Sequence, residues 1–246
     1  MNQKTKIRLF LTAIVIVGVF FANFSLSQET VSLKKESGGM GYSMFGNTTI
    51  DIKSLNNRLA SKGYPTMSDN FFSVGGGGHG ILTNKVIIGG EGQGLFGEEG
   101  TKGNFKTSFY GGYGMFNLGY LLYSVKEFRF YPLFGLGFGG FNLKIAENIG
   151  SISFDAVLED PKRKVDLSKG GFLLNFAVGI DYLLKLGEDE TGKAGFVIGF
   201  RAGYLLSPFV GDWYIDDILV SDAPDLSITG PYIRFMFGGG GIRKND

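Results

Sequence analysis

The sequence predicts an all-β protein: an eight-stranded antiparallel up-and-down transmembrane β-barrel with a short helix in the first long loop. Three observations predict this fold. The chain begins with an export pattern, most of its length alternates large apolar residues with glycine or polar residues, and the connections between the alternating segments are short and long in turn. A closed ring of strands can cross a bilayer because every backbone polar group finds a partner within it.

The first residues have the order of a secretory signal. Three basic residues within the first eight precede an uninterrupted apolar stretch at residues 9–24, and Ser-Leu-Ser follows at 25–27. This order predicts a signal peptide at residues 1–27, cleaved before Gln28, and a barrel domain at residues 28–246. The alternative is an uncleaved anchor, although about 16 apolar residues are slightly short for a membrane span.

The composition narrows the class of protein. The chain has 41 Gly, 24 Phe and 11 Tyr but no Cys, so neither a disulfide framework nor a thiolate metal site is possible. Its length fits one domain. The net charge is +1, and it becomes −2 if the three basic residues of the signal are removed, so charge gives no argument for nucleic acid. No cofactor is predicted.

Alternation with a period of two marks the strands. In residues 170–186, Phe172, Phe176 and Ile180 fall on one face, whereas Asn175 and Asp181 fall on the other. Side chains of a strand alternate between faces, and a helix would need a period near 3.6. On the same pattern, strands are predicted at 38–46, 70–82, 85–97, 104–123, 128–146, 169–186, 194–206 and 228–242.

The two faces predict which side is inside. The second face is mainly glycine with a few ionisable residues, which suits the interior of a narrow barrel better than a solvent-facing surface. The face rich in Phe and Leu is then expected to meet lipid. Aromatic girdles are expected at Tyr120, Phe128, Tyr182 and Phe196 on the periplasmic side and at Phe172 and Tyr204 on the opposite side.

The connections predict the orientation. Those at 47–69, 147–168 and 207–227 are the longest, and all three follow odd-numbered strands, as external loops should when both termini are periplasmic. In the first of them, Ile52, Leu55 and Leu59 are spaced as on one face of a helix, which Gly63 and Pro65 would end. Packing of this stripe on the barrel rim is the expected use.

The signal, the eight alternating strands and the order of turns and loops resemble the small outer-membrane barrels of the OmpA-barrel and OmpX-like group. The resemblance covers residues 38–242 and is one of pattern, without a specific motif. It implies a bacterial outer membrane, contact with its lipid, and assembly by the barrel-assembly machinery. Members of the group usually end on an aromatic residue, whereas this chain ends GGGGIRKND, with Phe237 nine residues before the end. This difference leaves the assembly signal open.

The predicted inward face carries both signs of charge. It collects Glu91, Gln93, Asn117, Arg129, Asn175, Asp181, Arg201 and Arg234. A lumen charge network of Glu91, Arg129, Asp181, Arg201 and Arg234 is predicted to hold the barrel shut, because eight strands enclose little more than side-chain volume. Glu91 or Asp181 is expected to pair with Arg201 or Arg234. The alternative is that these residues only line a hydrated interior.

Two other sequence patterns are candidates for a functional site. Gly135–Gly140 matches a dinucleotide fingerprint by letter, but the segment after it continues as strand rather than as the helix that this site needs. His79 is the only histidine and could serve a lipid-modifying barrel enzyme, but no nucleophile signature accompanies it. A histidine of the barrel wall or lumen is the expected interpretation, and no catalytic or metal residue is predicted.

The leading functional hypothesis is a non-enzymatic protein with a structural or surface-interaction role carried by its external loops. Within loop 207–227, Trp213 and Tyr214 among several acidic residues are binding candidates, since exposed aromatics with acids bind cations or sugars. The surface ligand itself is not predicted. A lipid-modifying enzyme that uses His79 and a small passive pore are the alternatives.

Overall fold

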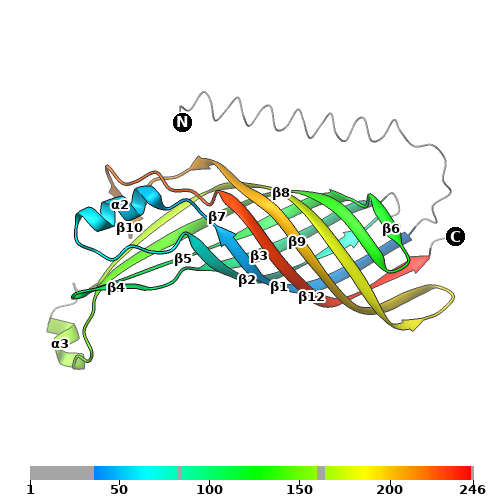
Figure 1. The fold of residues 1–246 in the computed structure, drawn as a ribbon, viewed down its shortest axis with the longest axis horizontal. Helices are drawn as coiled ribbons and strands as arrows, with labels where there is room; N and C mark the ends of the chain where they lie inside the picture. The colour runs from blue at the N-terminus through cyan, green and yellow to red at the C-terminus, as the bar shows by residue number, and fades with distance from the viewer. Residues whose placement is uncertain (1–35, 83–84, 160–163, 245–246) are drawn as a thin grey trace.

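A computed structural model describes residues 36–82, 85–159 and 164–244, and the predicted signal peptide at residues 1–27 lies outside the described residues. Most of the described chain is strand (Figure 1). The eight long strands are β1 (Glu36–Thr49), β2 (Asn70–Ile81), β3 (Val86–Phe96), β5 (Phe105–Tyr120), β7 (Phe128–Glu147), β8 (Lys164–Glu188), β9 (Gly192–Val210) and β12 (Gly230–Lys244). The short elements are α2 (Lys53–Ser61), α3 (Phe154–Glu159), β4 (Gly100–Lys102), β6 (Tyr123–Val125), β10 (Trp213–Ile215) and β11 (Ile218–Val220).

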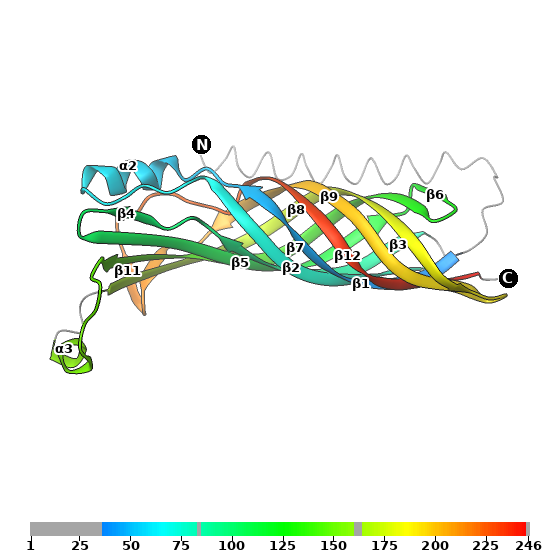
Figure 2. The same ribbon diagram turned by 60° about the horizontal axis from the view of Figure 1, so that its bottom comes forward.

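The eight long strands form a closed ring. Each pairs antiparallel with its neighbours in the order β1, β2, β3, β5, β7, β8, β9, β12, and β12 pairs again with β1. Figure 2 shows the tilted strands wrapping around one axis. The predicted eight-stranded antiparallel barrel is therefore confirmed, with each predicted strand matched by one long strand.

The register fixes the dimensions of the barrel. From Met44, the paired residues in one direction are Gly75, Gln93, Tyr113, Gly139 and Gly171, and in the other they are Met236, Gly199 and Asp181. Both paths end on β8, at Gly171 and Asp181, a stagger of ten residues (181 − 171). For eight strands this gives a tilt of about 41° and a backbone radius of about 8 Å, which leaves room for side chains only.

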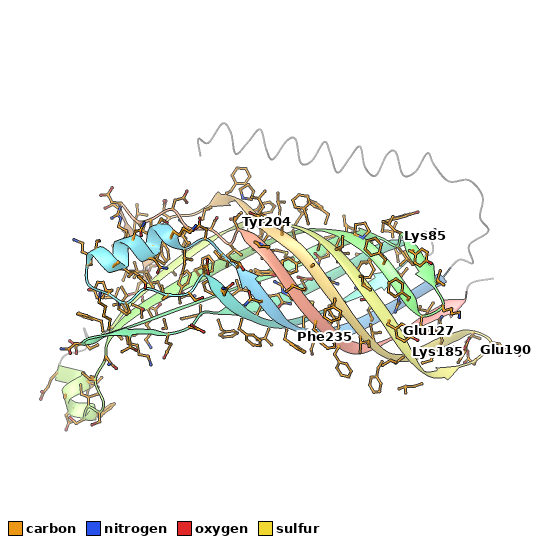
Figure 3. The ribbon with its side chains drawn as sticks, viewed as in Figure 1. Lys85, Glu127, Lys185, Glu190, Tyr204 and Phe235 are labelled. Carbon is orange, nitrogen blue, oxygen red and sulfur yellow. The ribbon has the colours of Figure 1, made fainter. Side chains whose placement is uncertain are left out.

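The two faces of the wall differ as predicted. Along β8, the residues Asn175, Ala177, Gly179, Asp181 and Leu183 are buried, whereas Val178, Ile180, Tyr182 and Leu184 are 40–44% exposed. The buried set points into the barrel and the exposed set points outward, because neighbouring side chains of a strand lie on opposite faces. Tyr204 and Phe235, both outward-pointing, show the same arrangement on β9 and β12 (Figure 3).

Helix α2 covers one mouth of the barrel, as predicted. Leu55 and Leu59 are buried, together with Ile52 just before the helix. The side chain of Asn56 ties the helix to the chain that leads into β2: its Nδ2 donates to the carbonyl oxygen of Met67 at 2.8 Å, and its Oδ1 accepts from the Met67 amide at 3.0 Å. Gly63, with a φ of 82°, follows the helix in a conformation that favours glycine.

The predicted external loop at 147–168 is shorter in the structure than the sequence indicated. Strand β8 begins at Lys164, and β7 and β8 pair as far as Ala146 and Lys164, so the hairpin extends well beyond the rim of the barrel (Figure 1). Helix α3 lies at its tip and was not predicted. The loop at 207–227 also contains strands, since β10 and β11 form a small hairpin attached to β8 through Tyr214 and Ser168.

None of the helices among residues 36–82, 85–159 and 164–244 is long and apolar enough to span a membrane.

Candidate functional site

The lumen is the first candidate site, because the five predicted charged residues all point into it. Arg201, Arg234 and Asp181 have no exposed surface, and Arg129 and Glu91 are 2% and 6% exposed. Each sits on the inward face of its strand, where the alternation places it. Burial of ionisable groups is costly unless they are paired, so the contacts of each charge decide whether the arrangement is stable.

Glu91 on β3 is the centre of the contacts and joins two arginines. Its Oε2 accepts a hydrogen bond from Arg201 on β9, and its Oε1 lies 3.4 Å from the Nη1 of Arg234 on β12. The amide of Asn117 on β5 donates to Oε2 at 3.1 Å. One buried carboxylate thus links strands from opposite sides of the ring. We call Glu91, Asn117, Arg201 and Arg234 the Glu91 cluster.

Hydroxyl groups add further contacts to the two arginines. Arg234 donates to Ser73 and to Thr48, both at 3.3 Å, and to the hydroxyl of Tyr113, and its guanidinium stacks 3.9 Å from the ring centroid of Tyr232. Planar guanidinium groups can combine several such contacts, which makes arginine suited to a buried site.

Arg201 uses a tyrosine in the same way. Its Nη2 donates to the hydroxyl of Tyr42 at 3.2 Å, and the guanidinium lies 5.3 Å from the centroid of that ring. Tyr42, Tyr113 and Tyr232 were not predicted as site residues from the sequence. Each of them lies at an inward position of its strand. The alternation along the strand is therefore the sequence signal that could have identified them.

Asp181 belongs to a second group, nearer the end of the barrel away from α2. Its Oδ2 accepts from the hydroxyl of Tyr131 at 2.8 Å and lies 4.0 Å from Nε2 of His79. Arg129 is its register partner across β7 and β8. Asp181 forms no ion pair with Arg201 or Arg234 among the described residues, so of the two carboxylates named from the sequence only Glu91 forms ion pairs with those arginines.

His79 lies in the lumen wall between aromatic rings. It is 6% exposed, its Nδ1 lies 3.3 Å from the Tyr42 hydroxyl, and the ring centroids of Tyr42 and Tyr131 are 5.5 and 5.4 Å away. No serine, threonine or cysteine is among these contacts. The position is that of the lumen histidine expected from the sequence.

Apolar side chains close the lumen on both sides of the polar layer. Toward α2, Phe71 and Phe109 pack with ring centroids 5.5 Å apart, and Phe141 stacks on Phe109 at 4.7 Å. Toward the other end, Met40, Leu183, Val197 and Ile242 pack in one buried cluster. Water would therefore have to pass an apolar layer at each end, as well as the Glu91 cluster, to cross the barrel.

The external loop candidates are placed differently from the expectation. Trp213 is 3% exposed, so the prediction of an exposed binding aromatic is wrong for this residue. Its indole Nε1 donates to the carbonyl oxygen of Pro224 at 3.0 Å, and it packs with Leu226 and Ile228 in the cluster that fills the mouth of the barrel. A large ring covers more of that apolar surface than any other residue of the loop could. Tyr214, the next residue, is 40% exposed.

The opposite end of the barrel carries a small charged collar. Lys85, Glu127, Lys185 and Glu190 lie there (Figure 3). Lys185 and Lys193 lie 3.1 and 3.8 Å from the carboxylate of Glu127. The hydrogen bond from Lys185 holds the pKa of Glu127 below its usual value.

Two further kinds of site have no support in the described residues. Gly135–Gly140 runs within β7, so no helix follows the glycines to form a dinucleotide site. No group of three or more His, Cys, Asp or Glu side chains is close enough to hold a metal ion within residues 36–82, 85–159 and 164–244.

These features define a class of protein: a closed eight-stranded antiparallel β-barrel with an apolar outer wall and a lumen filled by side chains. No family model and no curated protein sequence matches the chain. Among solved structures it is similar to Ail, the attachment invasion locus protein of Yersinia pestis, at 13% identity over 86% of this chain and 99% of that one, with a TM-score of 0.41.

Two other solved structures show a similar overlap. The outer membrane protein OprG from Pseudomonas aeruginosa is 11% identical over 85% of this chain and 96% of that one, with a TM-score of 0.37. The outer membrane protease OmpT from Escherichia coli is 10% identical over 88% and 99%, with a TM-score of 0.33. All are small outer-membrane barrels, the group that the sequence pattern resembles. The assignment of the fold to this chain rests on its own strand pairing.

Proposed function

We propose that the protein is a bacterial outer-membrane barrel with a closed lumen and a non-enzymatic, structural or surface-interaction role. The observation that carries the proposal is the combination of an apolar outside with an inside filled by charged and apolar side chains. A barrel of this kind is a rigid membrane anchor, and what it presents outside the membrane is then the part available for function.

The outer wall supports membrane placement. Large apolar side chains point outward on each of the eight long strands, among them Phe45, Phe72, Phe96, Phe116, Phe138, Val178, Phe200, Ile233 and Phe237.

 The exposed fractions of these outward side chains run from 44% for Val178 to 72% for Phe138. A soluble monomer rarely exposes contiguous apolar surface beyond a few hundred Å², whereas lipid makes such a belt favourable.

The charged residues and the external elements support an assignment of where the apolar outer surface ends and of which end of the barrel faces outward. The charged collar, with the ion pairs of Glu127 to Lys185 and Lys193, marks one end, and α2, α3 and the β10–β11 hairpin extend from the other (Figure 1). Outer-membrane barrels have short periplasmic turns and longer extracellular loops. We therefore place the α2 end outside the cell and the collar in the periplasm.

The lumen supports a closed barrel rather than a pore. Glu91 joins Arg201 and Arg234 across the interior, and apolar layers lie above and below them. An eight-stranded ring has no spare width for water to bypass these side chains.

A non-enzymatic role fits the position of His79. A general base must reach the proton that it removes, but His79 is 6% exposed within the wall and its neighbours are tyrosines and Asp181. A lipid substrate outside the barrel would have no access to this ring. Tyr214 and the other exposed residues of the external elements are the proposed surface for interaction.

Cysteine labelling tests the placement, because the chain contains no Cys of its own. Phe154→Cys lies on α3 and Glu190→Cys lies on the turn between β8 and β9, and both parent side chains are exposed. In intact cells a membrane-impermeant maleimide should label the Phe154 variant only, and the Glu190 variant should react after the outer membrane is opened. Equal labelling of both variants in intact cells, or the reverse order, would contradict the proposal.

Export by a cleaved signal is part of the same proposal. The basic start and the apolar stretch at residues 9–24 support a mature N-terminus at Gln28. Protein sequencing of material purified from the native envelope measures this directly. Recovery of Met1 at the N-terminus would show that the segment is retained as an anchor.

A further inference from the structure

A groove of about 460 Å³ runs along the outside of the wall, near the α2 end. Its floor is backbone, because glycines stand side by side on neighbouring strands. Gly112 on β5 pairs with Gly140 on β7, Gly140 pairs with Gly170 on β8, and the amide of Gly211 donates to the carbonyl oxygen of Gly170 at 2.8 Å. All four line the groove.

The rows of outward side chains on either side of this floor differ in character. On the side toward the middle of the barrel, the register aligns Phe138, Phe172 and Phe209. On the side toward the external loops, it aligns Tyr110, Asn142, Ser168 and Tyr214. The glycine floor therefore lies at the step from an aromatic row to a polar row, which is where the headgroup level of a bilayer meets a barrel.

The polar groups of the groove have their hydrogen-bonding capacity available. Within the described part of the chain, the side chains of Asn142, Ser168, Asp212 and Tyr214 make no hydrogen bond or ion pair. The exposed ring of Tyr214 borders the floor, so a flat ligand on the glycines would touch one aromatic ring and several donors and acceptors.

The charge of the groove selects among ligands. Asp212 is its one exposed charged side chain, since the ammonium group of Lys169 is turned to the interior, 3.8 Å from Asp225 and 5.7 Å from the Trp213 ring centroid. An anionic phosphate would meet a carboxylate without a cation, which is unfavourable. A neutral group with several hydroxyls fits the amide, hydroxyl and carboxylate groups present.

We propose that this groove binds the sugar ring of a membrane glycolipid, with the acyl chains lying against the row of Phe138, Phe172 and Phe209. The ring rests on the glycine floor beside Tyr214, and its hydroxyls bond Asn142, Ser168 and Asp212. The inference rests on the proposed membrane function, because only a barrel in a bilayer presents this groove to a lipid headgroup.

Retention of lipid by the folded, full-length barrel tests the proposal. The protein is equilibrated in detergent micelles with galactosyl diacylglycerol or with phosphatidylglycerol of the same acyl chains, and bound lipid is counted by native mass spectrometry. Free galactose is a third probe.

The variants are chosen from the space around each glycine. A Cβ added at Gly170 would have its nearest neighbour at 3.6 Å, so Gly170→Val fills the groove without a backbone clash. Gly92→Val, with its nearest neighbour at 3.8 Å on the outward face of β3, is the matched control. Tyr214→Ala removes the ring. Heat stability of each variant shows whether it is folded.

The parent and Gly92→Val should retain the galactolipid in preference to phosphatidylglycerol, and Gly170→Val and Tyr214→Ala should bind it roughly threefold to tenfold more weakly. Equal retention of both lipids, or equal binding by Gly170→Val and the parent, would overturn the proposal. Binding of free galactose as strong as that of the galactolipid would overturn its assignment to a lipid. Because cysteine labelling reports membrane placement separately, a failure of the groove is distinguishable from a failure of the proposed function.

Discussion

Removal of the charge of Glu91 is the perturbation with the largest expected effect on the barrel. Glu91→Gln keeps the size of the side chain but takes away the carboxylate that faces both Arg201 and Arg234. Arg201 keeps its bond to Tyr42, and Arg234 keeps its hydroxyl partners, but neither retains a carboxylate. Breaking a buried ion pair from one side costs about 3–5 kcal/mol, and we expect Glu91→Gln to lie in that range.

Arg201→Ala should cost less than Glu91→Gln. In that variant Glu91 still faces Arg234 and still accepts from Asn117, so no charge is left without a partner of opposite sign. Loss of the hydrogen bonds of Arg201 to charged and neutral partners costs about 1.5–3 kcal/mol.

Urea unfolding in detergent measures both variants, with the fluorescence of Trp213, the single tryptophan, as the probe. A variant with Glu91→Leu, Arg201→Met and Arg234→Met together is the control, because replacing a whole buried ion cluster by apolar residues is often neutral. It should recover much of the stability lost in Glu91→Gln. If Glu91→Gln unfolds at the same urea concentration as the parent, the charges are hydrated and the reasoning is refuted.

Two further substitutions test the two faces of the wall. Phe176→Arg, on an outward residue near the middle of β8, should lower the stability of the barrel in lipid by about 2–4 kcal/mol. Phe154→Arg on the exposed helix α3 should cost little, and unchanged stability of the Phe176 variant would argue against a lipid-facing wall. Gly179→Ala should destabilise the barrel by about 1–3 kcal/mol, because its Cβ would lie 2.4 Å from the ring of Tyr131. Gly41→Ala, whose Cβ would have its nearest atom at 4.0 Å, is the tolerated control, and equal urea midpoints of the two variants would show that the lumen has room to spare.

The barrel itself was predictable because its signal is local. Period-two alternation of large and small residues fixes both the strands and their faces, so all eight long strands follow from the sequence. The helix in the first long loop follows from the helical spacing of Ile52, Leu55 and Leu59. The inward position of Glu91, Arg201 and Arg234 follows from the same alternation.

The partners across the lumen were not predictable in the same way. Which inward residues meet depends on the stagger of ten residues around the ring, which no single strand records. This is why Asp181 and Glu91 could not be told apart as partners of the arginines, and why Tyr42 and Tyr113 were missed.

The predictions for the external segments were wrong for a different reason. Val165 and Leu167 continue the inward phase of β8 above the rim, but the polar residues that alternate with them, Lys164, Asp166 and Ser168, are typical of a loop. Trp213 was expected to be exposed because loops are usually on the surface, yet the mouth of a barrel needs an apolar cover, and the loop supplies it.

Conductance across a planar bilayer is the most direct test of the central claim, that side chains close the lumen. Folded wild-type protein should give no steady open channel at any applied potential, whereas a porin in a separate bilayer, the positive control, should conduct. Reproducible, long-lived single-channel steps from the purified wild-type barrel would contradict the claim and show that water and ions pass the Glu91 cluster.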